Sequence, residues 1–170
     1  MNHTRILAVD DEPLNLAIIE EYLCEEPNYT LDTAQDGECA WTALEGTAKP
    51  YDLVILDRMM PVLDGMALLS RMKADARFAD IPVIMQTAAA APEQVREGMA
   101  AGAYYYLTKP YEPETLCAVV RAAIGDRHAL RSALSRAESL ERAFQQLTEV
   151  EFRFRTLDEA SQLAQLLSDF

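Results

Sequence analysis

Four short apolar runs, each followed by a polar residue and a helix-like stretch, constrain the fold of this 170-residue chain most strongly. They occupy residues 5–9, 51–56, 82–86 and 104–107, and a weaker, alternating run occupies residues 29–34. Continuous apolar runs of this length are typical of parallel strands that are buried on both faces. The sequence therefore predicts five βα units.

The stretches between these runs carry the usual signals for the start of a helix. Proline is favoured in the first turn and aspartate at the N-cap, and both types recur at the expected places: Pro13, Asp36, Asp64, Pro92 and Pro113. Alternating strands and helices in so short a chain predict an α/β fold with a doubly wound parallel sheet. In such sheets, ligands bind at the carboxyl ends of the strands.

Polar residues follow four of the five predicted strands. Asp10 and Asp11 follow the first, Asp57 follows the third, Thr87 the fourth and Lys109 the fifth. Because the carboxyl ends of parallel strands meet at one edge, we expect these side chains to converge. Three neighbouring carboxylates resist ionisation unless a hard divalent cation and a fixed ammonium group offset their charge. The pattern therefore predicts a Mg²⁺ site beside Lys109.

Five motifs together resemble the receiver domains of two-component response regulators, over residues 4–125. They are VDDEP at residues 9–13, LDRMMP at 56–61, DG at 64–65, QTA at 86–88 and YLTKP at 106–110. The resemblance implies a five-stranded, flavodoxin-like (βα)5 sheet. It also implies a cis peptide bond between Lys109 and Pro110.

The resemblance also implies the role of each site residue. Asp57 is the expected phosphoacceptor, and Lys109 and Thr87 are expected to hold the phosphoryl oxygens. Mg²⁺ is expected to bind the carboxylates of Asp11 and Asp57 and the backbone carbonyl of Met59. Asp10 is expected to support the metal through water. This assignment agrees with phosphoryl transfer in general, in which a protein mainly positions the nucleophile and neutralises charge.

The same resemblance implies a conformational switch and a phosphoryl donor. A phosphoryl group adds about −1.5 to −2 charges, which should draw the Thr87 hydroxyl inward and let Tyr106 follow it. The expected donor is a sensor histidine kinase, a phosphotransfer protein or acetyl phosphate. A protein of this kind catalyses only its own modification, so we do not expect an enzyme.

The charge of the chain argues against anionic partners. The net charge is −13, and residues 1–125 carry 20 acidic against 9 basic residues, so we expect no direct contact with nucleic acid. We also expect no membrane segment, because no stretch approaches the roughly 20 apolar residues that a span requires. The cytoplasm is the expected location.

Residues 126–150 form a predicted helical linker with the spacing of a short coiled coil. Its apolar positions alternate in steps of three and four: Leu130, Ala133, Ala137, Leu140, Phe144 and Leu147. Arg136 and Glu141 are placed to pair across a parallel homodimer. The alternative is that this stripe packs on the receiver-like part of its own chain. A second alternative, that His128 belongs to a phosphorylatable histidine box, is disfavoured because Ala129 replaces the expected acidic neighbour.

Residues 151–170 are predicted to begin a further, incomplete domain after the receiver-like domain (1–125) and the linker (126–150). Residues 151–155 alternate like a strand, and residues 156–159 form a capping box before an amphipathic pattern. This stretch resembles the opening of GHKL-type ATPase domains of the anti-sigma-factor serine-kinase class. The chain is therefore expected to be the front part of a longer protein.

Three other functions remain to be weighed against a phosphorylation switch. The chain could be the switch portion of a larger ATP-dependent kinase or ATPase, or a binding module that works without phosphorylation. An aspartate-nucleophile phosphatase is disfavoured, because that chemistry needs a second aspartate two residues after the nucleophile and Met59 stands there.

Overall fold

The structure is a computed structural model that describes residues 3–24, 26, 28–88 and 91–168, and side chains up to Gln146 and at Thr148. It contains one parallel sheet with the strand order β2-β1-β3-β4-β5. The strands are β1 (Thr4–Val9), β2 (Tyr29–Ala34), β3 (Leu53–Asp57), β4 (Val83–Thr87) and β5 (Tyr105–Thr108). The prediction of a doubly wound, five-stranded parallel sheet is confirmed.

The register of the sheet brings the carboxyl ends of its central strands to one edge. Asp57 pairs with Gln86 across β3 and β4, and Thr87 pairs with Thr108 across β4 and β5. Every residue of β3 and β4 is buried, as their apolar sequences require. Polar groups at the ends of these strands therefore lie at the rim of a buried layer.

The helices begin where the sequence signals predict. They are α1 (Pro13–Leu23), α2 (Gly37–Glu45), α3 (Gly65–Ala74), α4 (Pro92–Ala100) and α5 (Pro113–Ser168). The side chain of Asp36 accepts a hydrogen bond from the backbone N–H of Cys39, and that of Asp64 accepts one from Ala67, each at 2.7 Å. These two aspartates satisfy backbone donors that the first turn of a helix leaves free.

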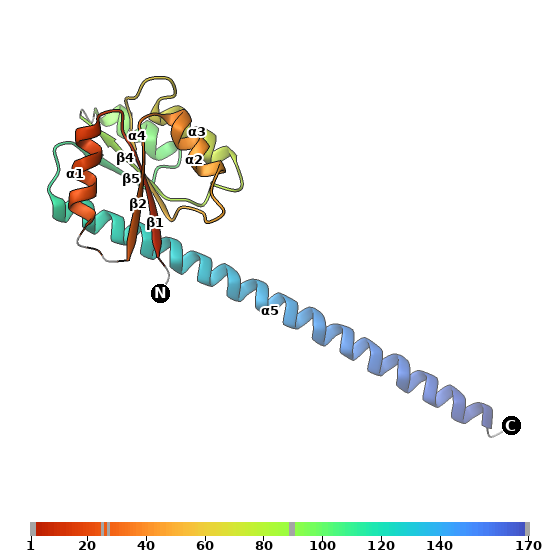
Figure 1. Cartoon of the computed structure of the whole chain (residues 1–170). Helices are drawn as coiled ribbons and strands as arrows, with labels where there is room; N and C mark the ends of the chain where they lie inside the picture. The colour runs from red at the N-terminus through yellow and green to blue at the C-terminus, as the bar shows by residue number, and fades with distance from the viewer. Residues whose placement is uncertain (1–2, 25, 27, 89–90, 169–170) are drawn as a thin grey trace. The chain divides into compact units, whose positions relative to one another are not determined.

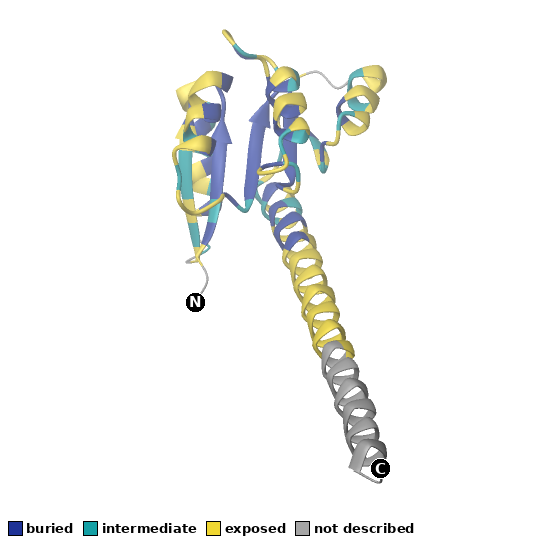
Figure 2. Cartoon of the chain, turned by 90° about the vertical axis from the view of Figure 1, so that its right-hand side faces the viewer, coloured by how far each residue is buried: buried dark blue, intermediate teal, exposed yellow. Residues whose placement is uncertain are grey.

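Alternate residues of each central strand enter two separate cores. Val54 and Leu56 of β3 pack with α2 and α3, whereas Leu53 and Ile55 pack with α1 and the first turns of α5. Figure 1 shows α1 on one side of the sheet and α2 and α3 together on the other. Figure 2 shows the buried central strands between these helices. The sheet is thus covered on both faces.

The chain divides into two units, Met1–His128 and Ala129–Phe170. The described part of the second unit is entirely helical, as part of α5, so the expected strand at residues 151–155 is wrong. A lone strand leaves its backbone groups without partners, whereas a helix pairs them internally. The division at residue 150 stays a prediction, and the side chain of Leu147 lies outside the described residues. Among the described residues, no helix is both long and apolar enough to cross a bilayer.

Candidate functional site

Three of the predicted site residues meet at the carboxyl edge of the sheet. The ammonium group of Lys109, just after β5, donates to Oδ2 of Asp10 at 2.6 Å and to Oδ1 of Asp57 at 2.5 Å. Asp10 is 1% exposed and Asp57 is 7% exposed. One cation thus bridges two buried carboxylates that lie 47 residues apart in the sequence.

Backbone and side-chain donors near the start of α1 orient Asp10. Its Oδ1 accepts from the backbone N–H of Glu12 and from the side-chain amide of Asn15, both at 3.0 Å. Asn15 was not among the site residues expected from the sequence, although an amide in the first turn after an acidic pair is a signal that could have identified it. Asp11 is exposed and lines the same pocket as Asp10.

The loop after β3 folds tightly around Asp57. The backbone N–H of Met59 donates to Oδ2 of Asp57 at 2.7 Å, and the N–H of Gly65 donates to the carbonyl of Arg58 at 3.0 Å. A Cβ at Gly65 would overlap the carbonyl oxygen of Asp57, so only glycine allows this close approach. The same loop contains Val62 at φ 67, a left-handed conformation that is uncommon for a β-branched residue.

Thr87 and Lys109 are joined through the backbone. The N–H of Lys109 donates to the carbonyl of Thr87 at 2.8 Å, and the Lys109–Pro110 peptide bond is cis, as expected from the resemblance. Thr87 is 4% exposed and lines the same pocket as Asp57 and Lys109. The ends of β4 and β5 therefore present their polar groups to one space.

Tyr106 lies on β5, and its hydroxyl accepts a hydrogen bond from the guanidinium group of Arg58 at 3.1 Å. Arg58 also forms an ion pair with Glu97 of α4 at 2.6 Å. Arg58 had no expected role from the sequence. Only its position next to Asp57 could have drawn attention to it.

The bridge between Lys109 and the two aspartates is not electrically balanced. Burial raises the pKa of Asp57, and nearby Asp10 raises it further, against the opposing effects of Lys109 and the Met59 N–H. Burial alone would lower the pKa of Lys109, but its hydrogen bonds to Asp10 and Asp57 raise it overall. The Asp57 shift thus comes chiefly from burial, and the Lys109 shift comes from its hydrogen bonds to the two carboxylates.

A pocket of about 440 Å³ opens above these groups. Its lining includes Asp10, Asp11, Asp57, Thr87 and Lys109. Among the described residues, no three acidic, histidine or cysteine side chains already form a metal cage. The Lys109 ammonium group lies between Asp10 and Asp57. Mg²⁺ commonly uses one or two carboxylates and several waters. The oxygen-rich lining fits that ion.

Residues 6–121 match the response regulator receiver domain family. This chain belongs to that family. Receiver domains of two-component response regulators act in phosphorelay signalling, are phosphorylated by histidine kinases and generally use Mg²⁺. The expectation that a receiver is a signalling protein rather than an ordinary enzyme agrees with this membership.

Two relatives and one solved structure illustrate how far the similarity of this receiver extends. The DNA-binding dual master transcriptional regulator RpaA of Synechocystis sp. is 36% identical over 153 residues, 90% of this chain and 61% of RpaA. Response regulator Rre1 of the same organism is 32% identical over 142 residues, 84% of this chain and 61% of Rre1. The chemotaxis protein CheY4 of Vibrio cholerae is 30% identical with a TM-score of 0.65, covering 71% of this chain and 98% of CheY4.

These relatives correct one expectation and leave another without support. The receiver chain spans 61% of the length of RpaA and Rre1. We expected no contact with nucleic acid, whereas RpaA is named as a DNA-binding protein. The net charge of this chain gives no information about the other domains of its relatives. The family and the relatives described here are response regulators and give no support to an ATPase domain. The strand expected to open such a domain is helical.

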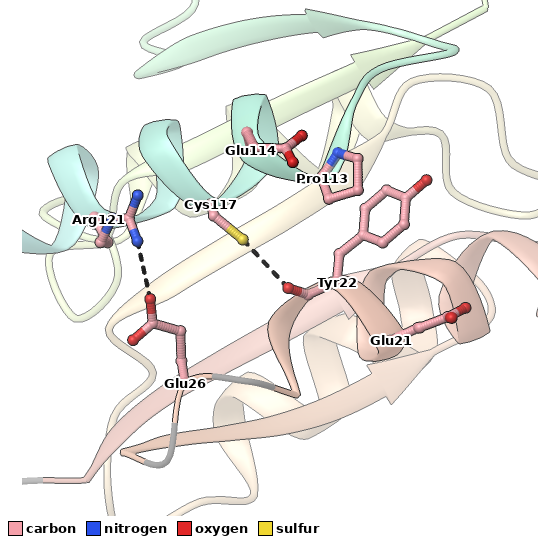
Figure 3. Close-up of a pocket in the computed structure, with 7 residues that line it drawn as sticks. All are labelled: Glu21, Tyr22, Glu26, Pro113, Glu114, Cys117 and Arg121. Carbon is pink, nitrogen blue, oxygen red and sulfur yellow. Dashed lines mark hydrogen bonds and ion pairs between the residues drawn. The ribbon is translucent and has the colours of Figure 1, made fainter.

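The receiver has a second pocket, of about 470 Å³, between α1 and the start of α5 (Figure 3). Arg121 forms an ion pair with Glu26 at 3.0 Å, and the thiol of Cys117 donates to the carbonyl of Tyr22 at 3.2 Å. These two contacts, drawn as dashed lines in Figure 3, join α5 to α1 and to the segment that follows α1. The pocket above Asp57 differs from this one, because an ammonium group there lies between two buried carboxylates.

Proposed function

We propose that Asp57 accepts a phosphoryl group from a phosphohistidine of a sensor histidine kinase or phosphotransfer protein. One observation carries this proposal. The Asp57 carboxylate is buried at the end of β3, lies in the lining of an open pocket and is held by both the Lys109 ammonium and the Met59 N–H. A carboxylate fixed in this way is positioned for in-line attack on phosphorus.

In the proposed reaction, a carboxylate oxygen of Asp57 forms a bond to phosphorus while the bond from phosphorus to the donor imidazole nitrogen breaks. The donor imidazole carries a proton on its other ring nitrogen, so it leaves as neutral imidazole. Lys109 and Thr87 bind the phosphoryl oxygens. The residues that would hold Mg²⁺ are Asp10, Asp11, Asp57 and the carbonyl of Met59. A bound Mg²⁺ supplies positive charge that offsets the charge of the transferred group.

Thr87 and Tyr106 are the proposed switch. The phosphoryl group attracts the Thr87 hydroxyl, and the Tyr106 ring then moves into the space that Thr87 vacates. Two features support this. Thr87 lines the pocket above Asp57 (the acceptor pocket), and the Tyr106 side chain on β5 is only partly buried against α4. The surface that α4 and β5 form would change as a result.

The helical extension is the proposed route to the output, through a homodimer. Its stripe includes Leu130, Leu140 and Phe144, which are 54%, 72% and 71% exposed, and Ala133 and Ala137 lie between them at heptad spacing. Light scattering should show a dimer that Leu140→Glu weakens, with Glu138→Gln, an exposed position outside the stripe, as the control. An unchanged mass for Leu140→Glu would favour the alternative that the stripe packs on its own chain.

The names of the relatives favour a transcriptional output for the full protein. RpaA is described as DNA-binding, so we propose that the receiver controls a DNA-binding function in a longer protein. The division into a receiver (1–125), a linker (126–150) and the start of an output domain (151–170) belongs to this proposal. Cytoplasmic location stays a prediction that goes with it.

The decisive experiment is phosphorylation with acetyl phosphate and Mg²⁺, followed by intact mass. The wild-type chain should gain one phosphoryl group, and Asp57→Asn should gain none. Asp80→Asn, which changes an exposed aspartate that does not line the pocket, is the matched control and should react like the wild type. A modified Asp57→Asn protein would show that another residue is the acceptor.

A further inference from the structure

Arg58 connects the acceptor strand to both α4 and β5. Its backbone N–H continues the sheet by donating to the Gln86 carbonyl at 2.9 Å. Its guanidinium group pairs with the Glu97 carboxylate at 2.6 Å and donates to the Tyr106 hydroxyl at 3.1 Å. The side chain of Arg58 is only 13% exposed. A single side chain next to Asp57 thus reaches the two elements that the proposed switch would move.

Tyr106 is held from a second side by α4. A Cβ built on Gly98 would lie 2.6 Å from Cε2 of the Tyr106 ring, so the ring rests directly on the backbone of the helix. The hydroxyl at the far end of that ring is the one that accepts from Arg58. The ring and α4 therefore share two connections, one by packing and one through Arg58 and Glu97.

We infer that Arg58 is a positioning residue that holds Tyr106 and α4 in the arrangement of the unphosphorylated receiver, with Glu97 as its anchor. This inference rests on the proposed function of Asp57. A contact made in only one of two states stabilises that state, and its removal shifts the population toward the other. Loss of the anchor therefore favours the switched state before any phosphoryl group arrives.

The conformational state and the binding of a phosphoryl group affect each other, and the effect on binding can be measured. If the switched state binds a phosphoryl group more tightly, a receiver that is released from the unphosphorylated arrangement must bind a phosphoryl mimic more tightly. Beryllofluoride, which coordinates an aspartate carboxylate as a phosphoryl group does, is a suitable probe. A Glu97→Gln variant keeps the shape of the side chain and removes the charge that pairs with Arg58.

Glu93 offers a matched control on the same helix. It forms an ion pair with Arg96 at 2.8 Å and its side chain is 76% exposed, compared with 59% for Glu97. Glu93→Gln removes the same charge from α4 without touching Arg58. Comparing the two variants separates release of Arg58 from the general effect of removing a negative charge near an anion site.

The experiment is a calorimetric titration of the full chain with beryllofluoride at saturating Mg²⁺, and of Mg²⁺ alone. Glu97→Gln should bind beryllofluoride about fivefold more tightly than the wild type, a coupling of ordinary size. Glu93→Gln should stay within about twofold of the wild type. The Mg²⁺ affinities of all three proteins should agree, because Glu97 does not line the acceptor pocket.

Each other outcome overturns the inference. Unchanged or weaker beryllofluoride binding by Glu97→Gln would show that the Arg58 contacts do not oppose the switch. If both variants bound beryllofluoride more tightly by the same factor, the effect would come from the loss of a negative charge alone. No binding by any of the three proteins would refute the proposed function of Asp57 and the role of Arg58 with it, so the two failures can be told apart.

Discussion

The receiver holds two groups of charged side chains around one sheet, and they differ in balance. At the carboxyl edge, Asp10 and Asp57 share the single ammonium of Lys109. Around the starts of β1 and β3, a second group, the basal cluster, contains two arginines, two aspartates and a tyrosine: Arg5, Asp32, Tyr51, Asp52 and Arg127. Balanced charges stabilise a fold, whereas an excess of one sign creates affinity for a ligand of the other sign.

The contacts of the basal cluster show how complete its pairing is. Arg5 pairs with Asp32, and its guanidinium lies 4.4 Å from the centre of the Tyr51 ring. The Tyr51 hydroxyl donates to Asp32 at 2.9 Å. Arg127 donates to the Tyr51 carbonyl and lies 3.7 Å from Asp52. Each ionised side chain in the cluster has an oppositely charged partner within the protein.

The largest expected effect comes from breaking the basal cluster. Arg127→Met should lower the free energy of unfolding by about 3 kcal/mol, because it leaves the buried carbonyl of Tyr51 and the carboxylate of Asp52 without this cation. Urea denaturation measures the change. Arg121→Met on the same helix removes an exposed ion pair with Glu26 and should cost less than about 1 kcal/mol.

If the basal cluster only stabilises the fold, Arg127→Met should leave the phosphorylation of the receiver unchanged. Below its denaturation midpoint, the variant should gain a phosphoryl group from acetyl phosphate at the rate of the wild type. A variant of normal stability that fails to react would place Arg127 in the function of the receiver and would end the distinction between the two clusters.

A second, smaller effect should appear at alkaline pH. Burial, together with the hydrogen bond to Asp32, raises the pKa of Tyr51 from 10.0 to about 12. The folded protein keeps this proton at pH values where the unfolded chain has lost it, so the stabilisation is complete below pH 10 and is lost as the pH rises to about 12. The loss from this one group should be about 2 kcal/mol.

Tyr51→Phe isolates that contribution, since its other titrating groups are the same as those of the wild type. Its free energy of unfolding should fall less steeply between pH 10 and 12, while Tyr111, whose pKa burial also raises to about 12, still contributes. Urea titrations across this pH range give the free energy of unfolding of each protein. If this free energy falls equally steeply with pH in both proteins, the hydroxyl of Tyr51 is not held in the folded state.

The sequence predicts the sheet and the acceptor pocket well because both depend on local signals. Buried strands have continuous apolar runs, which are visible in the sequence. The topology of such a sheet brings the ends of β1, β3 and β5 together, so Asp10, Asp57 and Lys109 could be grouped from the sequence alone. The roles of these residues remain predictions.

Contacts between distant segments could not be predicted in this way. The hydrogen bond from Arg58 to Tyr106 joins residues 48 positions apart and depends on how α4 packs on β5. The predicted strand at residues 151–155 failed for a different reason. Alternating phenylalanine and arginine satisfies a strand pattern, but these residues are also compatible with a helix, and α5 includes them.

The smallest expected effect tests the unbalanced site directly. A carboxyl group whose pKa is raised by folding destabilises the protein at neutral pH, and that penalty disappears as the pH falls through the raised pKa. Asparagine reproduces the uncharged state, so without Mg²⁺ the Asp57→Asn protein should have a higher free energy of unfolding than the wild type. Lys109 keeps Asp10 as its partner in this variant.

Adding Mg²⁺ should reverse that order. At ten times its dissociation constant, the ion should stabilise the wild type by about 1.4 kcal/mol and the Asp57→Asn protein by much less. Thermal denaturation of both proteins with and without Mg²⁺ gives the four values needed. If Asp57→Asn is the less stable protein without Mg²⁺, Lys109 already compensates the negative charge, and the two clusters differ in location but not in balance.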